Sequence, residues 1–539
     1  MRFTRVALAV FMCAALLTAS CQSSSSGSSG SSGGSGASSS WEAAISKETK
    51  GAKKVETETR TWYEAFVYSF CDSNGDRIGD LEGLRSQLEY IRWMGFNGIW
   101  LMPIHPSPSY HKYDVKDYYE IDPDYGTLED FDRLMEKCEQ LGISVILDLV
   151  LNHSSSEHPW FKGAIEDLKN GNTDSELVSY YFFEKRAPGG TWHEATGEWC
   201  YEGQFSPYMP DLNLENELLR KELEKVMQFW LEKGVKGFRL DAIKEFVSGN
   251  ATKNIEILSW ISSAAKSIRP DVYLVGENWD TTDTLYTYYK GIDSQFEYPF
   301  GTSSGHIAKA LLQNNGQNAE SFLGAMMHTQ EKVGEYGGSG ASDAPFFINH
   351  DNSRAAGFLR RDPDLIKTAW GMNLMMSGDA FVYYGEELGM SGSGKDENKR
   401  LAMQWSSDPD AVGMTSGPKD RETVEHGFPS ASEQIGDETS IMRYVRNAAL
   451  MREKYPAIAL GTGEILPTSG DPVIGALRKT YGDSSVVLVY NLSAESHEVT
   501  PSGGESWGKL SDWLSATGVK ATQSGDTLTL PPRTIAILK

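Results

Sequence analysis

Short apolar runs alternate with helical patterns along most of the chain. The segments 128–142 and 219–234 place apolar residues three and four positions apart, which is typical of amphipathic helices. Strands that alternate with helices form a parallel sheet with the helices on its outside. The apolar runs are 65–70, 98–104, 144–151, 237–240, 272–276, 346–349 and 381–385, with a weaker one at 293–300. Together they predict an α/β fold, a (β/α)₈ TIM barrel.

Two regions depart from this alternation. Residues 152–213 are aromatic and loop-like, which predicts an inserted domain between two parts of the barrel, 61–151 and 214–455. From residue 456 to residue 539, apolar and polar residues alternate between Gly- and Ser-rich turns. Period-two alternation is typical of strands with one buried face, so this segment predicts a small antiparallel β-domain.

The first residues are typical of an export signal. Arg2 and Arg5 precede an apolar run that ends at Leu17 and is too short to span a bilayer. The sequence LLTASC ends at Cys21 and resembles a bacterial lipoprotein box, although its Leu lies one residue further from the Cys than usual. Residues 1–21 therefore predict a lipid anchor at Cys21, with plain secretion as the alternative. Residues 22–60 follow as a Ser- and Gly-rich tether and lead-in.

Net charge and cysteine content limit the partners, metal sites and disulfides that the chain is expected to have. The net charge of −24 disfavours nucleic acid as a partner, because phosphate binding needs clustered Lys and Arg. Cys13 and Cys21 belong to the export signal, and the spacing of the remaining cysteines does not fit a metal site. We expect no disulfide framework, although a single pair stays open, and we expect a monomer that contacts a membrane only through Cys21.

Polar residues end four of the predicted strands. They are Asn152 and His153, Arg239 and Asp241, Glu277, and His350 and Asp351. Residues i and i+2 of a strand point to the same side, so Arg239 and Asp241 should share one spot. In a barrel of this kind the carboxyl ends of the strands surround one cavity, so all four sets should converge there.

Three carboxylates with an arginine suggest glycoside hydrolysis, which needs one ionised carboxylate and one carboxylic acid. Arg239 would keep Asp241 ionised, which suits a nucleophile. Like charges nearby would keep the proton on Glu277, which suits a general acid and later base. The alternative reading of the Arg–Asp pair is a structural ion pair inside the barrel.

The segments DLVLNH, GFRLDAIKEF, VGENW and FINHDNSR closely resemble, in order and spacing, the four motifs of the α-amylase family of glycoside hydrolases. MPDLN and YDVKDYYEIDPDYGT resemble two further stretches of that family. The resemblance implies a (β/α)₈ barrel, an inserted B domain, a C-terminal β-sandwich, and retention through a covalent glycosyl-enzyme. By motif, Asp241 would be the nucleophile, Glu277 the acid/base and Asp351 the third carboxylate.

The resemblance also implies subsite residues. Tyr113, His153, Arg239 and His350 would bind the sugar in subsite −1, and Lys244 would bind substrate beyond it. MPDLN lies between the forms found in oligo-1,6-glucosidase-like and neopullulanase-like members. Glu245 stands where α-1,4-acting relatives have His. Asp114 and Arg400 would close the non-reducing end of subsite −1, as the matching residues do in exo-acting relatives.

The segment DSNGDRIGDLEG, residues 72–83, is a candidate calcium site. Its oxygen donors are Asp72, Asn74, Asp76, Asp80 and the carbonyl of Ile78. An all-oxygen set suits Ca²⁺, but the spacing is not that of an EF-hand. The segment resembles a structural calcium site in α-glucosidase-like family members, and an Asx-rich surface turn is the alternative. A second calcium at Asn152 stays open.

The sequence therefore predicts an exported α-amylase that acts on starch or maltooligosaccharides. Neopullulanase, α-glucosidase and 4-α-glucanotransferase activities are the close alternatives, because all of them share the three carboxylates. A non-catalytic glycan-binding lipoprotein is an alternative of a different class. An intact set of Asp241, Glu277 and Asp351 argues against it.

Overall fold

The computed structural model describes Ile45 and residues 60–338, 340–425, 427–469 and 471–539. The predicted export signal, Cys21 and most of the tether lie outside these residues. All of the described residues belong to one compact unit.

A parallel sheet closes into a barrel. Among the described residues its neighbouring strands run in the order β10-β9-β8-β7-β3-β2-β1-β11. Between β11 and β10, the Phe381 N–H donates to the carbonyl of Pro345 at 2.8 Å, and Phe346 pairs with Phe381. The strands are β1 (Thr61–Ala65), β2 (Gly98–Leu101), β3 (Ser144–Leu149), β7 (Gly237–Leu240), β8 (Tyr273–Gly276), β9 (Ser294–Phe296), β10 (Ser342–Ala344) and β11 (Ala380–Tyr383). The predicted (β/α)₈ barrel is confirmed.

Two predicted strands were misplaced. The apolar run 65–70 is mostly helix α2 (Val67–Phe70), and the strand β1 lies just before it. The run 346–349 follows β10 instead of forming it. Both runs are buried, so they carry the apolar signal of a strand. Periodicity cannot tell a buried strand from another buried segment when the run is this short.

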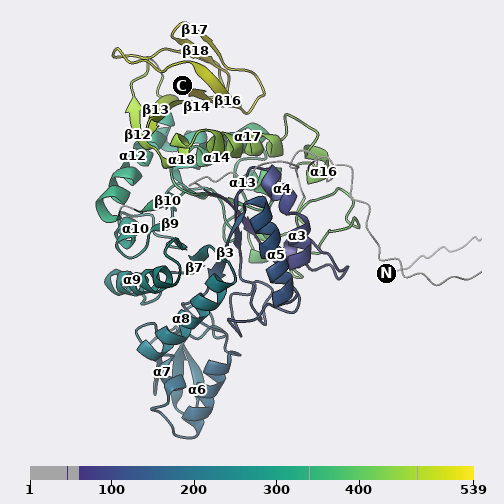
Figure 1. Cartoon of the computed structure of the whole chain (residues 1–539), viewed down its shortest axis with the longest axis vertical. Coiled ribbons are helices and arrows are strands. Elements are labelled where there is room, and N and C mark those ends of the chain that lie inside the picture. Colours follow the sequence, from purple (N-terminus) through teal and green to yellow (C-terminus); the bar gives the residue numbers. More distant parts are fainter. Residues whose placement is uncertain (1–44, 46–59, 339, 426, 470) are drawn as a thin grey trace, which may run out of the picture. The chain divides into compact units, whose positions relative to one another are not determined.

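Amphipathic helices cover the outside of the barrel (Figure 1). Helix α5 (Leu128–Leu141) begins with a capping box between Thr127 and Asp130 and ends at Gly142, whose φ is +69°. Helices α8 (Glu217–Glu232) and α9 (Ala251–Ile268) flank β7 along the chain. The other helices are α3 (Leu81–Ser86), α4 (Leu88–Trp93), α10 (Thr284–Thr287), α11 (His306–Leu311), α12 (Ala319–Tyr336), α13 (Ala355–Phe358), α14 (Pro363–Leu374), α15 (Asp396–Lys399), α16 (Ala431–Gln434), α17 (Ile441–Lys454) and α18 (Ala457–Leu460), with short 3₁₀ turns at Tyr288–Lys290, Asn314–Gly316 and Glu386–Leu388.

The insert after β3 has secondary structure of its own within the same compact unit. It contains helices α6 (Pro159–Lys169) and α7 (Glu176–Ser179) and a three-stranded antiparallel sheet. The strands of that sheet are β4 (Phe183–Glu184), β6 (Trp199–Glu202) and β5 (Trp192–Thr196). His153 pairs with Asp211, so the two ends of the insert meet beside the end of β3.

The C-terminal segment forms two antiparallel sheets. One has the order β12-β13-β14-β19-β16 and the other the order β15-β18-β17. Leu528 and Leu530 of the small sheet share an apolar core with Val487 and Leu538 of the large one, as expected for a β-sandwich. The strands are β12 (Thr462–Leu466), β13 (Ile474–Tyr481), β14 (Ser484–Asn491), β15 (His497–Val499), β16 (Leu510–Ser515), β17 (Thr522–Ser524), β18 (Thr527–Leu530) and β19 (Thr534–Leu538).

A buried lysine joins this sandwich to the barrel. The Nζ of Lys479 on β13 donates to the carbonyls of Met375 at 2.9 Å and Ile458 at 2.6 Å, and to the Ser377 hydroxyl at 3.0 Å. Burial, assisted by the charge of Arg452, lowers the pKa of Lys479 well below its usual value. The junction is therefore held by hydrogen bonds to backbone carbonyls as well as by apolar packing.

The described residues contain free thiols at Cys71, Cys138 and Cys200. In this part of the chain, every helix is too short or too polar to cross a membrane.

Candidate active site

The guanidinium of Arg239 lies at the centre of the predicted site. Its Nη1 is 2.6 Å from Asp241 Oδ1 and 2.7 Å from Asp148 Oδ1, and its Nη2 is 2.7 Å from Glu277 Oε2. The strand register places Asp148 opposite Arg239, and Arg239 opposite Val275, so β3, β7 and β8 bring these groups together. The predicted contact between Arg239 and Asp241 is present, and the same cation also holds two further carboxylates.

Burial shifts the proton affinities of this cluster. Desolvation raises the pKa of Glu277; the charge of Arg239 opposes that rise and the charge of Asp241 adds to it. The pKa of Asp148 rises to about 7, again mainly through burial, with Arg239 opposing. A carboxyl group with a raised pKa can hold a proton near neutral pH, as general acid catalysis requires.

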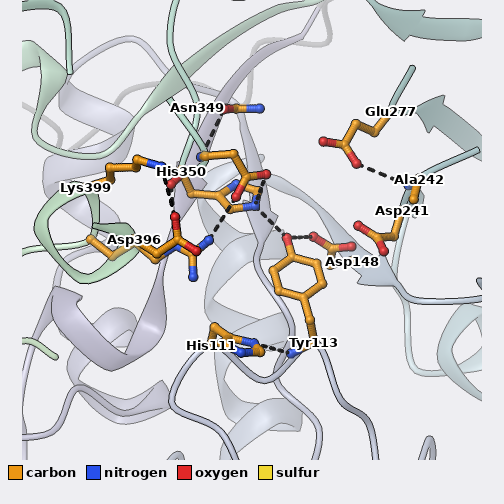
Figure 2. Close-up of polar contacts among 12 residues, drawn as sticks. His111, Tyr113, Asp148, Asp241, Ala242, Glu277, Asn349, His350, Asp396 and Lys399 are labelled. Carbon is orange, nitrogen blue, oxygen red and sulfur yellow. Dashed lines mark hydrogen bonds and ion pairs between the residues drawn. The ribbon is translucent and has the colours of Figure 1, made fainter. Parts of the chain in front are cut away.

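Short-range contacts fix the orientation of Glu277. Its Oε2 accepts a hydrogen bond from the N–H of Ala242 at 3.1 Å, and its Oε1 accepts one from the Tyr298 hydroxyl at 3.0 Å. Ala242 follows Asp241 directly and has a φ of +50°, a conformation that few non-glycine residues adopt. Figure 2 shows the Glu277 carboxyl turned toward the backbone of Ala242, beside Asp241. The turn after β7 thus couples the two carboxyl groups.

Tyr113 and His350 form a second part of the site. The hydroxyl of Tyr113 donates to Asp148 Oδ2 at 2.8 Å and lies 2.8 Å from His350 Nε2 (Figure 2). The other ring nitrogen of His350, Nδ1, is 2.6 Å from Oε1 of Glu64 on β1. Burial lowers the pKa of His350, but Asp351 and Glu64 outweigh it and raise that pKa to about 9. His350 is therefore a cation near neutral pH.

Asp351 is the accessible carboxylate. Its side chain is 44% exposed, and its oxygens lie 3.1 Å from His350 Nε2 and 2.9 Å from Arg400 Nη2. Desolvation favours the neutral form, but His350 and then Arg400 hold the pKa of Asp351 well below its usual value. Asp351 is thus an anion that faces the open side of the site.

Comparison with known proteins identifies the family. The model of the α-amylase catalytic domain matches residues 65–461. The chain belongs to the α-amylase family. It is 38% identical to alpha-amylase 3 of Dictyoglomus thermophilum, over 80% of this chain and 84% of that protein. It is 30% identical to glucan 1,6-alpha-glucosidase of Streptococcus pneumoniae, over 83% of this chain and 94% of that protein.

Solved structures of the α-amylase family share the fold. Amy13B of Eubacterium rectale aligns with a TM-score of 0.85 and 41% identity, covering 90% of this chain and 96% of that one. The alpha-amylase from H. orenii aligns with a TM-score of 0.77 and 34% identity, covering 89% and 99%. The protein is therefore an α-amylase-like glycoside hydrolase.

Two predicted substrate residues, His153 and Lys244, each lie beside an aromatic ring. His153 is buried, its ring centroid is 5.4 Å from that of Phe205, and within the described ranges its Nε2 has no hydrogen-bond partner. Lys244 lies with its Nζ 4.7 Å from the ring centroid of Trp279. A buried nitrogen without a partner is suited to bind a ligand hydroxyl, so His153 fits its predicted place.

Asp114 and Arg400, the predicted pair for exo-acting relatives, bind different partners. Oδ1 of Asp114 accepts a hydrogen bond from the Ser107 hydroxyl at 2.6 Å, and also one from Ser109. Arg400 pairs with Asp351 and donates to the Tyr110 hydroxyl at 3.3 Å.

The predicted calcium loop is a series of Asx turns. The side-chain oxygens of Asp72, Asn74 and Asp76 accept hydrogen bonds from backbone N–H groups two to five residues further along, at 2.8 to 3.0 Å. Asp80 caps helix α3 through the N–H of Gly83. Within the described segments, no three His, Cys, Asp or Glu side chains are grouped so that they could hold a metal ion. The donors are all oxygens, which suits Ca²⁺, but they are engaged with the backbone.

Three residues of the site were absent from the sequence prediction. Asp148 is a charged residue inside a buried strand, the same signal that identifies Arg239, but the apolar residues on both sides of it mask that signal. Glu64 lies in β1, which was misplaced. Tyr298 stands in no distinctive pattern, and only its contact with Glu277 identifies it.

The raised pKa of His350 predicts a loss of stability at alkaline pH. Because the pKa is about 9 in the folded protein against 6.5 ordinarily, the cation stabilises the fold fully below about pH 6.5, and this stabilisation is lost as the pH rises through about 9. We expect the free energy of unfolding, measured in urea, to fall by on the order of 1–3 kcal/mol across this window. His350→Gln should flatten that fall, and the control His328→Gln, at an exposed site on α12, should keep it. An equal fall in both variants would contradict the assignment.

Proposed function

We propose that this α-amylase-family enzyme hydrolyses α-1,4-glucosidic bonds of starch and maltooligosaccharides with retention of configuration. The observation that carries the proposal is the convergence of Asp241, Glu277 and Asp351 around Arg239 and His350. Relatives named alpha-amylase, at 38% and 34% identity, support the substrate class.

In the first step, Glu277 donates its proton to the glycosidic oxygen while an oxygen of Asp241 attacks the anomeric carbon. The bond to the leaving sugar breaks, and a covalent ester between Asp241 and the glycosyl group forms. In the second step, Glu277 takes a proton from a water molecule, the water oxygen attacks the anomeric carbon, and the ester breaks. The raised pKa of Glu277 suits its first role, and the fixed cation of Arg239 suits an anionic Asp241.

The shared guanidinium supports retention. Retaining glycosidases hold their two carboxyl groups about 5–5.5 Å apart, whereas inverting enzymes leave about 6.5–9.5 Å for a water molecule. Neighbouring nitrogens of one guanidinium contact Asp241 at 2.6 Å and Glu277 at 2.7 Å. That arrangement favours the shorter separation.

The remaining site residues would bind the sugar. Asp351 is the exposed anion and would accept hydrogen bonds from its hydroxyls, while Tyr113 offers a ring face and His153 a free nitrogen. Among the alternatives, an exo-acting α-glucosidase would use Asp114 and Arg400 to close the site. Their separate partners favour the endo-acting α-amylase. Relatives named alpha-glucosidase support the exo-acting alternative. Neopullulanase and 4-α-glucanotransferase activities share this site, and the product distribution distinguishes all of them.

The nucleophile assignment is tested with Asp241→Asn. We expect this variant to release sugar from soluble starch at least 10⁴-fold more slowly than the wild type, because the amide cannot form the glycosyl ester. A control, Asp132→Asn on the exposed face of α5, should match the wild type. Products resolved by size should be a spread of maltooligosaccharides from the wild type. Wild-type rates from Asp241→Asn, with an unchanged circular dichroism spectrum, would refute the assignment. A wild type that binds starch and releases no sugar would favour the non-catalytic glycan-binding alternative.

We further propose that the loop 72–83 binds a structural Ca²⁺. The donors would be Asp72, Asn74, Asp76, Asp80 and the carbonyl of Ile78. Asp72 Oδ2, Asn74 Oδ1 and Asp76 Oδ1 each accept one hydrogen bond, so each keeps a lone pair that could bind the ion. Millimolar Ca²⁺ should raise the melting temperature of chelator-treated protein by about 5 °C. Asp76→Ala should remove this rise and Asp410→Ala should keep it. A wild type that does not respond to Ca²⁺ or chelator would leave the loop as a plain turn.

Finally, we propose that the protein is exported and lipid-anchored at Cys21, as its N-terminal sequence indicates. In bacteria that process lipoproteins, the chain should incorporate a radiolabelled fatty acid and sediment with membranes. Cys21→Ser should lose both properties, whereas Cys13→Ser should retain them. Unlabelled wild type in the culture medium would favour plain secretion instead.

A further inference from the structure

A strained residue lies directly before Tyr113 of the site. Lys112 has a φ of +65°, in the left-handed region that favours glycine, and it lies between His111 and Tyr113. Strain of this kind persists only where the surrounding structure enforces it.

A buried ion pair holds Lys112 in this conformation. Lys112 is 3% exposed, and its Nζ lies 2.9 Å from Asp122 Oδ2 and 3.6 Å from Asp124 Oδ2. Asp122 is also buried, at 4% exposure, and Nζ lies 5.4 Å from the centroid of the Tyr125 ring. A buried charge is costly unless it is paired, so this lysine is fixed in place by its partner.

Hydrogen bonds carry this anchor to the site. Oδ2 of Asp122 also accepts the N–H of Ser107 at 3.1 Å, and the hydroxyl of Ser107 donates to Asp114 at 2.6 Å.

The other side of the loop is bound in the same way. Ser109, which also contacts Asp114, lies 3.1 Å from Nδ1 of His111, and the N–H of Tyr113 donates to that nitrogen at 3.2 Å. The ring of Tyr113 in turn stacks on His350 at a centroid distance of 5.6 Å. Hydrogen bonds therefore connect the Lys112–Asp122 pair, through Ser107 and Ser109, to Asp114, His111 and the backbone of Tyr113.

We propose that Lys112 is a positioning residue for substrate binding: its ion pair with Asp122 imposes the turn that sets Tyr113 and Asp114 at the sugar site. The inference rests on the proposed function for its substrate, an α-glucan. Lys112 itself is buried beneath the loop and acts through its neighbours.

Hydrogen exchange tests the structural half of this proposal without any substrate. In Lys112→Met, the amides of residues 107–114 should exchange at least tenfold faster than in the wild type. The matched control is Arg92→Met, which removes another largely buried cation, 3.2 Å from Glu453. That variant should leave exchange in 107–114 unchanged. Unchanged exchange in Lys112→Met would overturn the proposal.

Kinetics on a defined maltooligosaccharide test the functional half. Lys112→Met should lower kcat/KM at least tenfold, mainly through KM, while Arg92→Met keeps the wild-type KM. Lys112→Gly separates strain from anchoring, because glycine adopts a φ of +65° freely but lacks the ammonium group. It should lose kcat/KM like the Met variant. Wild-type kinetics in Lys112→Gly would mean that the ion pair positions nothing.

Asp122→Asn completes a double-mutant cycle. If Lys112 acts through Asp122, the kcat/KM of the double variant should be no lower than that of the more impaired single variant, because each substitution removes the same ion pair. Fully additive losses would refute that connection. A wild type that cleaves no α-glucan would refute the proposed function, and the exchange experiment would still decide the role of Lys112.

Discussion

One guanidinium in a closed barrel governs the chemistry of this protein. Among the residues that the structure describes, Arg239 is the one cation in direct contact with Asp148, Asp241 and Glu277, and it is almost fully buried. In this desolvated site, burial outweighs the charges of Arg239 and the nearby His350, so the cluster of three carboxyl groups tends to retain a proton. The raised pKa values of Asp148 and Glu277 express that tendency. Because the three carboxylates come from β3, β7 and β8, strand register and proton affinity are set together.

A second network of charged residues lies beside the first, and in it two cations contact one carboxylate. His350 lies between Glu64 and Asp351, and Arg400 adds a further cation to Asp351. These two cations depress the pKa of Asp351, so this carboxylate stays ionised while Glu277 can hold a proton. The Tyr113 hydroxyl joins the networks, since it contacts both His350 and Asp148. Similar carboxyl groups thus acquire different protonation states from their surroundings, as acid–base catalysis requires.

The sequence predicted those parts of the site that have a local signal. Arg239 and Asp241 were found because charged residues two apart interrupt a short buried strand, and the other motif residues because polar groups end apolar runs. Glu64 could not be found in this way, because its partner His350 lies 286 residues further along the chain. The strand β10 was misplaced because its own sequence, Ser-Asp-Ala, is polar, while the apolar run after it is buried without being a strand. Local periodicity reports burial, and only the closed barrel decides which buried segments pair.

The buried Lys479 bears on how this protein could be divided or recombined. The sandwich reads as a separate domain in sequence, and its boundary near residue 455 looks like a natural point for truncation. Yet its lysine donates to the Met375 carbonyl and the Ser377 hydroxyl, which belong to the barrel side of that boundary. A barrel expressed without the sandwich would leave the Met375 carbonyl and the Ser377 hydroxyl without this donor and would expose the apolar surface around them. The catalytic barrel is thus not a portable module, and a chimera that exchanges the C-terminal domain must keep a donor at this position.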